Sequence, residues 1–170
     1  MKIYRLFTLL ALSVILLSCG GEKKKEDKSE PIKISGQKEA KKESSSENQL
    51  SITGNDMMQY NKKELRVKAG KEVTLTLTHV GKMSKQVMGH NVVILKPGVD
   101  IQAFALKATE AGEADDWIPD GGKDVVVHTK MLGGGQSASI TFMAPEAGTY
   151  DFICSFPGHS ALMRGKFIVE

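Results

Sequence analysis

The sequence predicts an all-β domain, a sandwich or barrel of short antiparallel strands, preceded by a long segment that does not fold with it. Two observations support this prediction. β-Branched or alternating runs recur through the later two thirds of the chain, and glycine, proline or polar turn residues separate them. A third observation is one stretch near 99–112 with alanines and leucines spaced for a helix, which we expect to be a short helical insertion between strands.

Seven runs give the expected strands. They are, in chain order, ELRVKAG, EVTLTLTH, NVVIL, DVVVHT, ASITFMA, TYDFIC and GKFIVE. The clearest is EVTLTLTH, in which Val73, Leu75 and Leu77 face one side and the threonines between them face the other. About 120 residues are enough for one hydrophobic core and too few for two. We therefore predict a single domain over residues 50–170.

The first 18 residues are typical of an export signal. Lys2 and Arg5 precede an apolar run over 6–17, which is too short to cross a bilayer but suits a secretory signal peptide. A small residue, Cys19 and two glycines follow, and this resembles the bacterial lipoprotein processing site. We predict a lipoprotein signal peptide over 1–18 and lipid attachment at Cys19. The alternative is an ordinary cysteine late in a signal peptide.

Residues 19–49 are expected to be a disordered, charged tether that begins at the lipidated cysteine. The stretch is dense in lysine and glutamate and poor in apolar residues, so it cannot bury enough surface to offset its chain entropy. As a flexible coil of about 28 residues it would reach roughly 30 Å. Its charges are mixed in sign and the net charge of the whole chain is only +3, which argues against a nucleic-acid partner.

The stretch CSFPGHSALM, residues 154–163, carries the chemistry. It lies between two strand-like runs, so we expect a loop in which Cys154, His159 and Met163 converge on one point. If Cys19 carries lipid, Cys154 has no disulfide partner in the mature chain. An unpaired cysteine in an exported protein indicates a reactive thiol, an intermolecular bridge or a metal ligand.

A thiolate, an imidazole and a thioether are three of the four donors of a type 1 copper centre, which has a trigonal His₂Cys plane and a long axial Met. The missing imidazole is expected from His90, at the start of the apolar run NVVIL. Gly89, just before it, would let a backbone carbonyl approach the metal closely, because no Cβ is in the way.

Other interpretations of these residues exist. A lone buried cysteine is usually inert, a single methionine usually belongs to the core, and His90 alone would be a hydrogen-bonded strand residue. Cys154 with His159 could form a nucleophile and its base, but this leaves Met163 without a role. Zinc would accept the cysteine and both histidines, but its fourth ligand is normally not methionine. Soft sulfur donors favour copper.

Four segments resemble the azurins, the bacterial blue copper proteins of the cupredoxin family. They are, in chain order, TGNDMMQYN, VMGHN, VVHTKMLGGG and CSFPGHSALMRG, and the resemblance runs from about residue 51 to residue 170. It implies a Greek-key β-sandwich with a helical flap and one copper ion that cycles between Cu(I) and Cu(II). By position, His90, Cys154 and His159 would be the equatorial ligands, with Met163 and the Gly89 carbonyl as weak axial partners.

The resemblance also implies roles for neighbouring residues. Asn91 would tie the ligand loop down. Phe156 and Pro157 would form an apolar collar around the edge of His159. Electrons would pass at this edge, within an exposed apolar patch to which redox proteins such as c-type cytochromes or copper and haem reductases dock. The expected members of this docking patch are Met58, Met83, Val87, Met88, Phe156 and Pro157.

The chain departs from the azurin pattern in two places. Asn48 and Gly70 stand about where azurins carry the cysteines of a disulfide. Val92 replaces the usual tryptophan next to the first ligand, and the one tryptophan of this chain is Trp117. Neither change affects a ligand.

The two remaining histidines lie outside the expected metal sphere. We expect His79 to be partly buried and His128 to lie on the surface. Two imidazoles are too few for a second metal site, so we predict a protein without enzymatic activity.

The sequence therefore predicts a membrane-tethered copper electron carrier. The alternatives are a copper-binding or copper-delivery protein without a carrier role, and a redox-silent interaction module. A lipidated Cys19 would place the protein in the bacterial cell envelope, and we expect it at the outer membrane, facing the periplasm.

Overall fold

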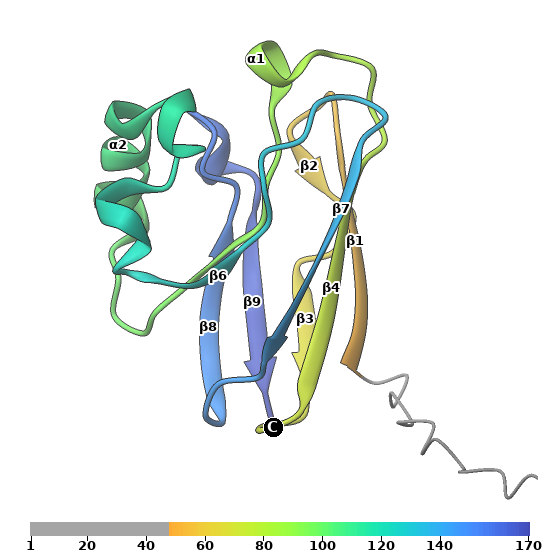
Figure 1. The fold of residues 1–170 in the computed structure, drawn as a ribbon, viewed down its shortest axis with the longest axis vertical. Coiled ribbons are helices and arrows are strands. Elements are labelled where there is room, and N and C mark those ends of the chain that lie inside the picture. The colour runs from red at the N-terminus through yellow and green to blue at the C-terminus, as the bar shows by residue number, and fades with distance from the viewer. Residues whose placement is uncertain (1–47) are drawn as a thin grey trace, which may run out of the picture. The chain divides into compact units, whose positions relative to one another are not determined.

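The computed structural model describes residues 48–170, in which two sheets face each other across one core (Figure 1). The first sheet contains, in spatial order, β2 (Gln59–Tyr60), β1 (Gln49–Asn55), β4 (Glu72–His79) and β7 (Ser137–Met143). The second contains β3 (Glu64–Val67), β9 (Arg164–Val169), β8 (Gly148–Ile153), β5 (Val93–Leu95) and β6 (Val125–His128). The predicted all-β sandwich is confirmed, and β1 begins one residue before the predicted domain boundary.

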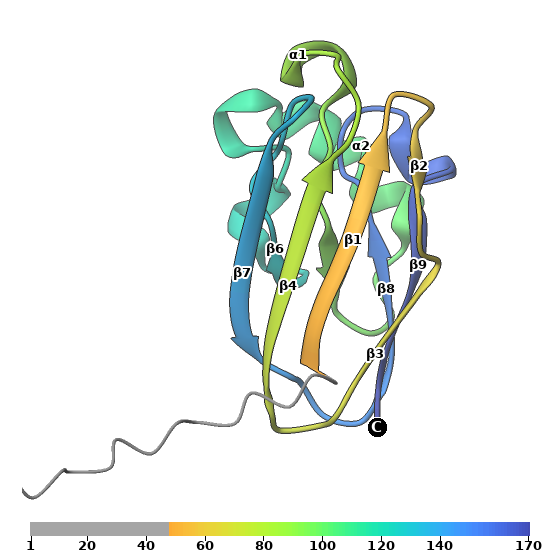
Figure 2. The same cartoon turned by 90° about the vertical axis from the view of Figure 1, so that its right-hand side faces the viewer.

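Most strand pairs are antiparallel, as predicted, but β1 with β4 and β3 with β9 are parallel. For these two pairs the prediction was wrong. The reason is that neither pair is a hairpin. After β2 the chain crosses to the second sheet for β3 and returns for β4, so β4 runs in the same direction as β1 (Figure 2). Strands β1 and β2 were not among the expected strands.

Strand β4 shows how the alternating pattern builds the core. Val73, Leu75 and Leu77 are fully buried between the sheets. The threonines of the opposite face pair their hydroxyls with β7, for example Thr76 with Ser139 at 2.7 Å. The alternation predicted for this run is therefore confirmed.

The helical insertion is α2 (Ile101–Ala111), within the predicted stretch. The Asp100 side chain caps its first turn by accepting a hydrogen bond from the Ala103 N–H at 2.8 Å, and Gly112, with φ of 67°, ends it. Phe104 and Ala108 pack with Val93 and Leu95 on the outer face of the second sheet. Since Val92 and Ile94 point into the core between the sheets, this strand region is buried on both faces, which explains its uninterrupted apolar sequence.

Short helical turns complete the connections. They are α1 (Lys85–Met88), η2 (Glu113–Asp115), η3 (Pro119–Gly122) and η4 (His159–Ala161). No helix within residues 48–170 is long and apolar enough to span a membrane. The predicted signal peptide, Cys19 and nearly all of the tether lie outside the described residues.

Asn48 connects the first strand to the β3–β4 turn. Its buried side chain accepts a hydrogen bond from the Lys68 N–H at 3.1 Å and donates one to the Glu72 carbonyl at 3.3 Å. Where the resemblance implies a disulfide in azurins, this chain has a pair of hydrogen bonds.

The two ends of the sandwich differ. Strand β1 starts near the chain's C-terminus and ends, about 20 Å further along, at Asn55 beside the loops that carry α1 and η4 (Figures 1 and 2). The imidazole of His90 contacts the Asn55 carbonyl, so the candidate site lies at this loop end.

Candidate metal centre

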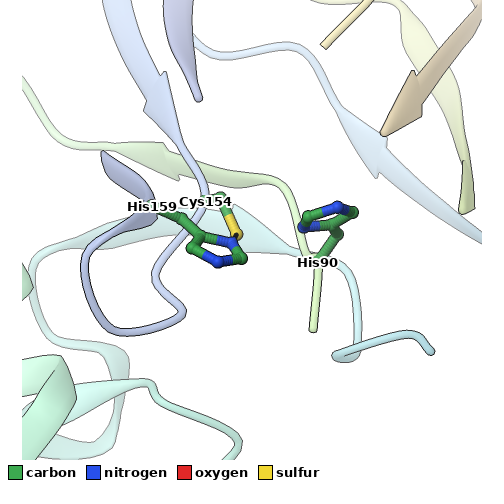
Figure 3. Close-up of side chains that lie close together, drawn as sticks. All are labelled: His90, Cys154 and His159. Atoms are coloured by element: carbon green, nitrogen blue, oxygen red, sulfur yellow. Dashed lines mark hydrogen bonds between the residues drawn. The ribbon is translucent and has the colours of Figure 1, made fainter. Parts of the chain in front are cut away.

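Three predicted ligands meet in the structure. One donor atom from each of His90, Cys154 and His159 lies within 4.8 Å of the other two, and all three residues are buried (Figure 3). His90 comes from the segment between α1 and β5, Cys154 follows β8 directly, and His159 begins η4. Residues 64 positions apart in the chain are thus brought together, as the sequence predicted.

The loop between β8 and β9 is closed by its own backbone. The Cys154 N–H donates to the Met163 carbonyl at 2.8 Å, and the Met163 N–H donates to the His159 carbonyl at 2.8 Å. Gly158, with φ of 80°, makes the left-handed turn just before η4. The loop therefore holds the sulfur and the imidazole of His159 at a fixed spacing.

His90 is oriented by a single hydrogen bond. Its Nε2–H donates to the Asn55 carbonyl at 2.8 Å, which leaves the lone pair on Nδ1. This Nδ1 is the one buried side-chain nitrogen or oxygen in residues 48–170 without a hydrogen-bond partner. Because an unpartnered buried polar atom is costly, its position among other donor atoms indicates that it serves to bind a metal ion.

The spacing of the donors fits a metal ion. The Cys154 Sγ lies 3.7 Å from the His159 Nδ1 and 3.7 Å from the Gly89 carbonyl oxygen. Two donors bound at about 2.0–2.3 Å in a trigonal plane would be separated by about 3.7 Å. Thiolate and imidazole donors suit copper and zinc, and a nearby thioether favours copper.

The two predicted axial partners also lie at the site. A Cβ on Gly89 would approach the Lys85 carbonyl to 2.6 Å and the Phe156 ring to 2.7 Å, so only glycine fits there. Met163 is fully buried, and its Cε and the His90 ring both lie against Gly54.

Burial sets the protonation of the donors. It lowers the pKa of His159 to about 4, with His90 nearby as a smaller cause, and it lowers the pKa of His90. Both imidazoles are therefore neutral at pH 7 and can bind a metal. Burial also raises the pKa of the Cys154 thiol to about 11, although the Asn91 and Phe156 backbone and the Tyr60 hydroxyl oppose this shift by hydrogen bonding. Metal binding at neutral pH would release the thiol proton.

The ring of His79 packs against the ring of His90. The two rings stack at a centroid distance of 4.2 Å and an interplanar angle of 19°. His79 is fully buried rather than partly buried as predicted. Its Nδ1 accepts from the Gly81 N–H at 3.0 Å and its Nε2–H donates to the Met88 carbonyl at 2.7 Å, so both nitrogens are occupied. The other histidine, His128, is half-buried on β6.

The surface above the site is partly apolar. His159 is only 3% exposed, with the Phe156 ring 4.7 Å from its own, and Trp117 packs on Phe156. Of the residues expected in the docking patch, Val87 and Met83 are well exposed and the other four are half-buried.

Sequence reasoning missed several supporting residues. Asn55, Tyr60 and Gly54 lie in or beside the segment TGNDMMQYN, which carried the resemblance but was given no role beyond Met58. A glycine followed by Asn-Asp marks a close approach and a turn, and this signal was available. Asn91 was assigned correctly: it donates to the Ser155 hydroxyl at 2.8 Å and accepts from the Ser155 N–H at 2.9 Å.

Fold and donor set together describe a small β-sandwich protein in which two imidazoles and a thiolate could hold one soft metal ion. Comparison with known proteins identifies the family. Residues 46–170 match the model of copper binding proteins of the plastocyanin/azurin family. The chain belongs to this family, and copper is its cofactor.

Relatives agree with this assignment. The chain is 46% identical to Azurin-2 of Alcaligenes xylosoxydans xylosoxydans over 121 residues, 69% of this chain and 93% of the relative. It is 45% identical over 118 residues to Outer membrane protein H.8 of Neisseria meningitidis serogroup B, covering 68% of this chain and 63% of the relative. Among solved structures, an azurin of Methylomonas sp. strain J superposes with a TM-score of 0.66 at 32% identity, over 72% of this chain and 97% of that one. Family and site together identify a copper electron-transfer protein.

Proposed function

We propose that this chain is a membrane-tethered carrier that passes single electrons between redox partners at a type 1 copper centre. Bound copper supplies the one-electron change between Cu(I) and Cu(II). The observation that carries the proposal is the buried, unpartnered Nδ1 of His90, which lies in the same small cluster as the donors of Cys154 and His159.

In this proposal His90, Cys154 and His159 would hold the copper ion, with Met163 and the Gly89 carbonyl as weaker ligands. The surrounding protein keeps these groups still. The Asn55 carbonyl fixes the His90 ring, and the backbone bond from Cys154 to Met163 closes the loop. Ligands that barely move when the ion changes charge allow fast electron transfer, because little rearrangement is needed.

The decisive test is Cys154→Ser in the purified domain. Addition of Cu(II) to the wild type should give an intense blue absorption band and rapid electron self-exchange, and the variant should lose both. His128→Ala is the matched control, since this half-buried imidazole lies outside the donor set. A variant at position 154 that stays blue and still exchanges electrons would end the proposal.

A copper-delivery protein is the second candidate. Such a protein would bind copper in a colourless, readily exchanged form. The buried donor set favours the carrier, because its ligands are all enclosed. We also propose that the protein is not an enzyme.

Partners would dock over the His159 edge through the docking patch, as small interfaces between redox proteins do. Met88→Glu should slow self-exchange without bleaching the copper centre, because a charge would be desolvated in each encounter. Met143→Glu is the control, since Met143 is exposed at the far end of β7. An unchanged exchange rate in Met88→Glu would remove the patch from the proposal. The expected partners are c-type cytochromes or copper and haem reductases.

Lipid on Cys19 would anchor the protein in the bacterial envelope, with the outer membrane facing the periplasm as the proposed location. Support comes from the lipoprotein-like sequence around Cys19 and from a 45% identical relative named an outer membrane protein. Cys19→Ala should move the protein from the membrane fraction to the soluble fraction, while Cys154→Ser should leave it in the membrane. Continued membrane fractionation of Cys19→Ala would contradict the anchor.

A further inference from the structure

A buried tyrosine lies between the two segments that carry His90 and Cys154. Tyr60, in the two-residue strand β2, is 5% exposed, and its ring packs on Phe152 at a centroid distance of 5.7 Å. Its hydroxyl donates a hydrogen bond to the Asn91 carbonyl, which belongs to a fully buried residue. The hydroxyl thus satisfies a polar group in the interior, next to a metal ligand.

Asn91 in turn makes hydrogen bonds to the segment that carries Cys154. Its backbone follows His90, and its side chain makes the two hydrogen bonds to Ser155, at 2.8 and 2.9 Å, beside Cys154. A continuous path of buried hydrogen bonds therefore runs from Tyr60 through Asn91 to Ser155. It links strand β2, the His90 segment and the start of the ligand loop.

The surroundings of Tyr60 keep its hydroxyl protonated. Burial, and to a smaller extent the charge and hydrogen bonding of Cys154, raise the pKa of Tyr60, and the hydroxyl in turn helps to lower the pKa of the thiol. Tyr60 is therefore neutral and protonated, and its hydroxyl can donate to the backbone next to one ligand.

We propose that Tyr60 is a positioning residue: its hydroxyl fixes the Asn91 carbonyl and, through the Asn91–Ser155 contact, sets the distance between the His90 imidazole and the Cys154 sulfur before metal binds. The proposal rests on the proposed function in one respect, since the groups positioned are the copper ligands. Phenylalanine at this position would keep the ring packing but leave the Asn91 carbonyl without the hydroxyl proton, which destabilises a buried acceptor.

Tyr60→Phe tests the inference, with Tyr150→Phe as the matched control. Tyr150 is 7% exposed and also donates its hydroxyl to a backbone carbonyl, that of Glu146 at 2.8 Å, so both variants lose one comparable hydrogen bond. In the metal-free domain we expect the amide hydrogen of Ser155 to exchange at least about tenfold faster in Tyr60→Phe than in Tyr150→Phe. In the copper-loaded domain we expect the sulfur-to-copper absorption band to shift only in Tyr60→Phe.

Equal Ser155 exchange in the two variants, or equal absorption bands, would overturn the inference. The wild type gives an independent check: the Tyr60 hydroxyl proton should be a resolved, slowly exchanging resonance in the metal-free domain, and its absence would also overturn it. A colourless wild type would count against the proposed function alone, because the exchange measurement needs no metal.

Discussion

Gly54→Ala should disturb the metal centre by crowding the His90 ring, although Gly54 is not one of the proposed ligands. Gly54 lies in β1, where an added Cβ would stand 2.7 Å from the His90 Cδ2 and 3.2 Å from the Met163 Cε. Ordinary carbon contacts are about 3.5–4.0 Å, so the His90 ring would have to move by about 1 Å. The ring cannot do so freely, because it is bonded to the Asn55 carbonyl and stacked on His79.

The expected cost is that of overpacking a filled core, about 1–3 kcal/mol. Urea denaturation of the metal-free domain should show this loss in the free energy of unfolding, and the copper-loaded domain should show a shifted absorption spectrum. Gly148→Ala is the control, because its Cβ would meet nothing closer than 3.6 Å. If Gly54→Ala matches Gly148→Ala in both stability and spectrum, the close packing behind His90 is refuted.

Two further predictions concern the metal-free domain. Asn48→Ala should lower the free energy of unfolding by about 1–2 kcal/mol, because it removes the hydrogen bonds to Lys68 and Glu72. The control is Gln49→Ala, at the exposed neighbouring position, which should leave the free energy of unfolding unchanged. Equal urea midpoints for the two variants would contradict this prediction. Because burial raises the pKa of Cys154 to about 11, its alkylation by iodoacetamide should accelerate about tenfold per pH unit from neutral pH and level off only near pH 11. The folded state binds the thiol proton more tightly than the unfolded state, so stability should fall as the pH rises from about 9 to 11. An alkylation rate that levels off near pH 8.5 would exclude the raised pKa of Cys154.

The fold was predictable where a strand has one buried face. Alternation in EVTLTLTH and the helical spacing before Gly112 gave β4 and α2 directly, because burial imposes those periods. Strand β1 escaped prediction because its buried positions are few: Ile52 and Gly54 alternate with serine and threonine, and the glycine adds no apolar signal. Parallel pairing of β1 with β4 depends on how the chain crosses between sheets, which no local pattern records.

The site divides in the same way. Three donors fall within one ten-residue loop, so their convergence could be inferred from spacing, and His90 completed the set because copper requires a second imidazole. What could not be inferred are contacts between distant segments. Three such contacts depend on how the two sheets pack against each other. They are the stacking of His79 on His90, the near-complete burial of His159 and the Tyr60–Asn91 hydrogen bond.

The direction of β1 determines which end of the domain is free to meet a redox partner. Whatever precedes Asn48 joins the domain at the end remote from the proposed copper ligands, with the length of the sandwich in between. A membrane attachment through that end would leave the docking patch around His159 free to meet a partner. A fusion placed before Gln49 should therefore be tolerated without loss of electron exchange, whereas an insertion in the β1–β2 turn would stand in the path of any approaching partner.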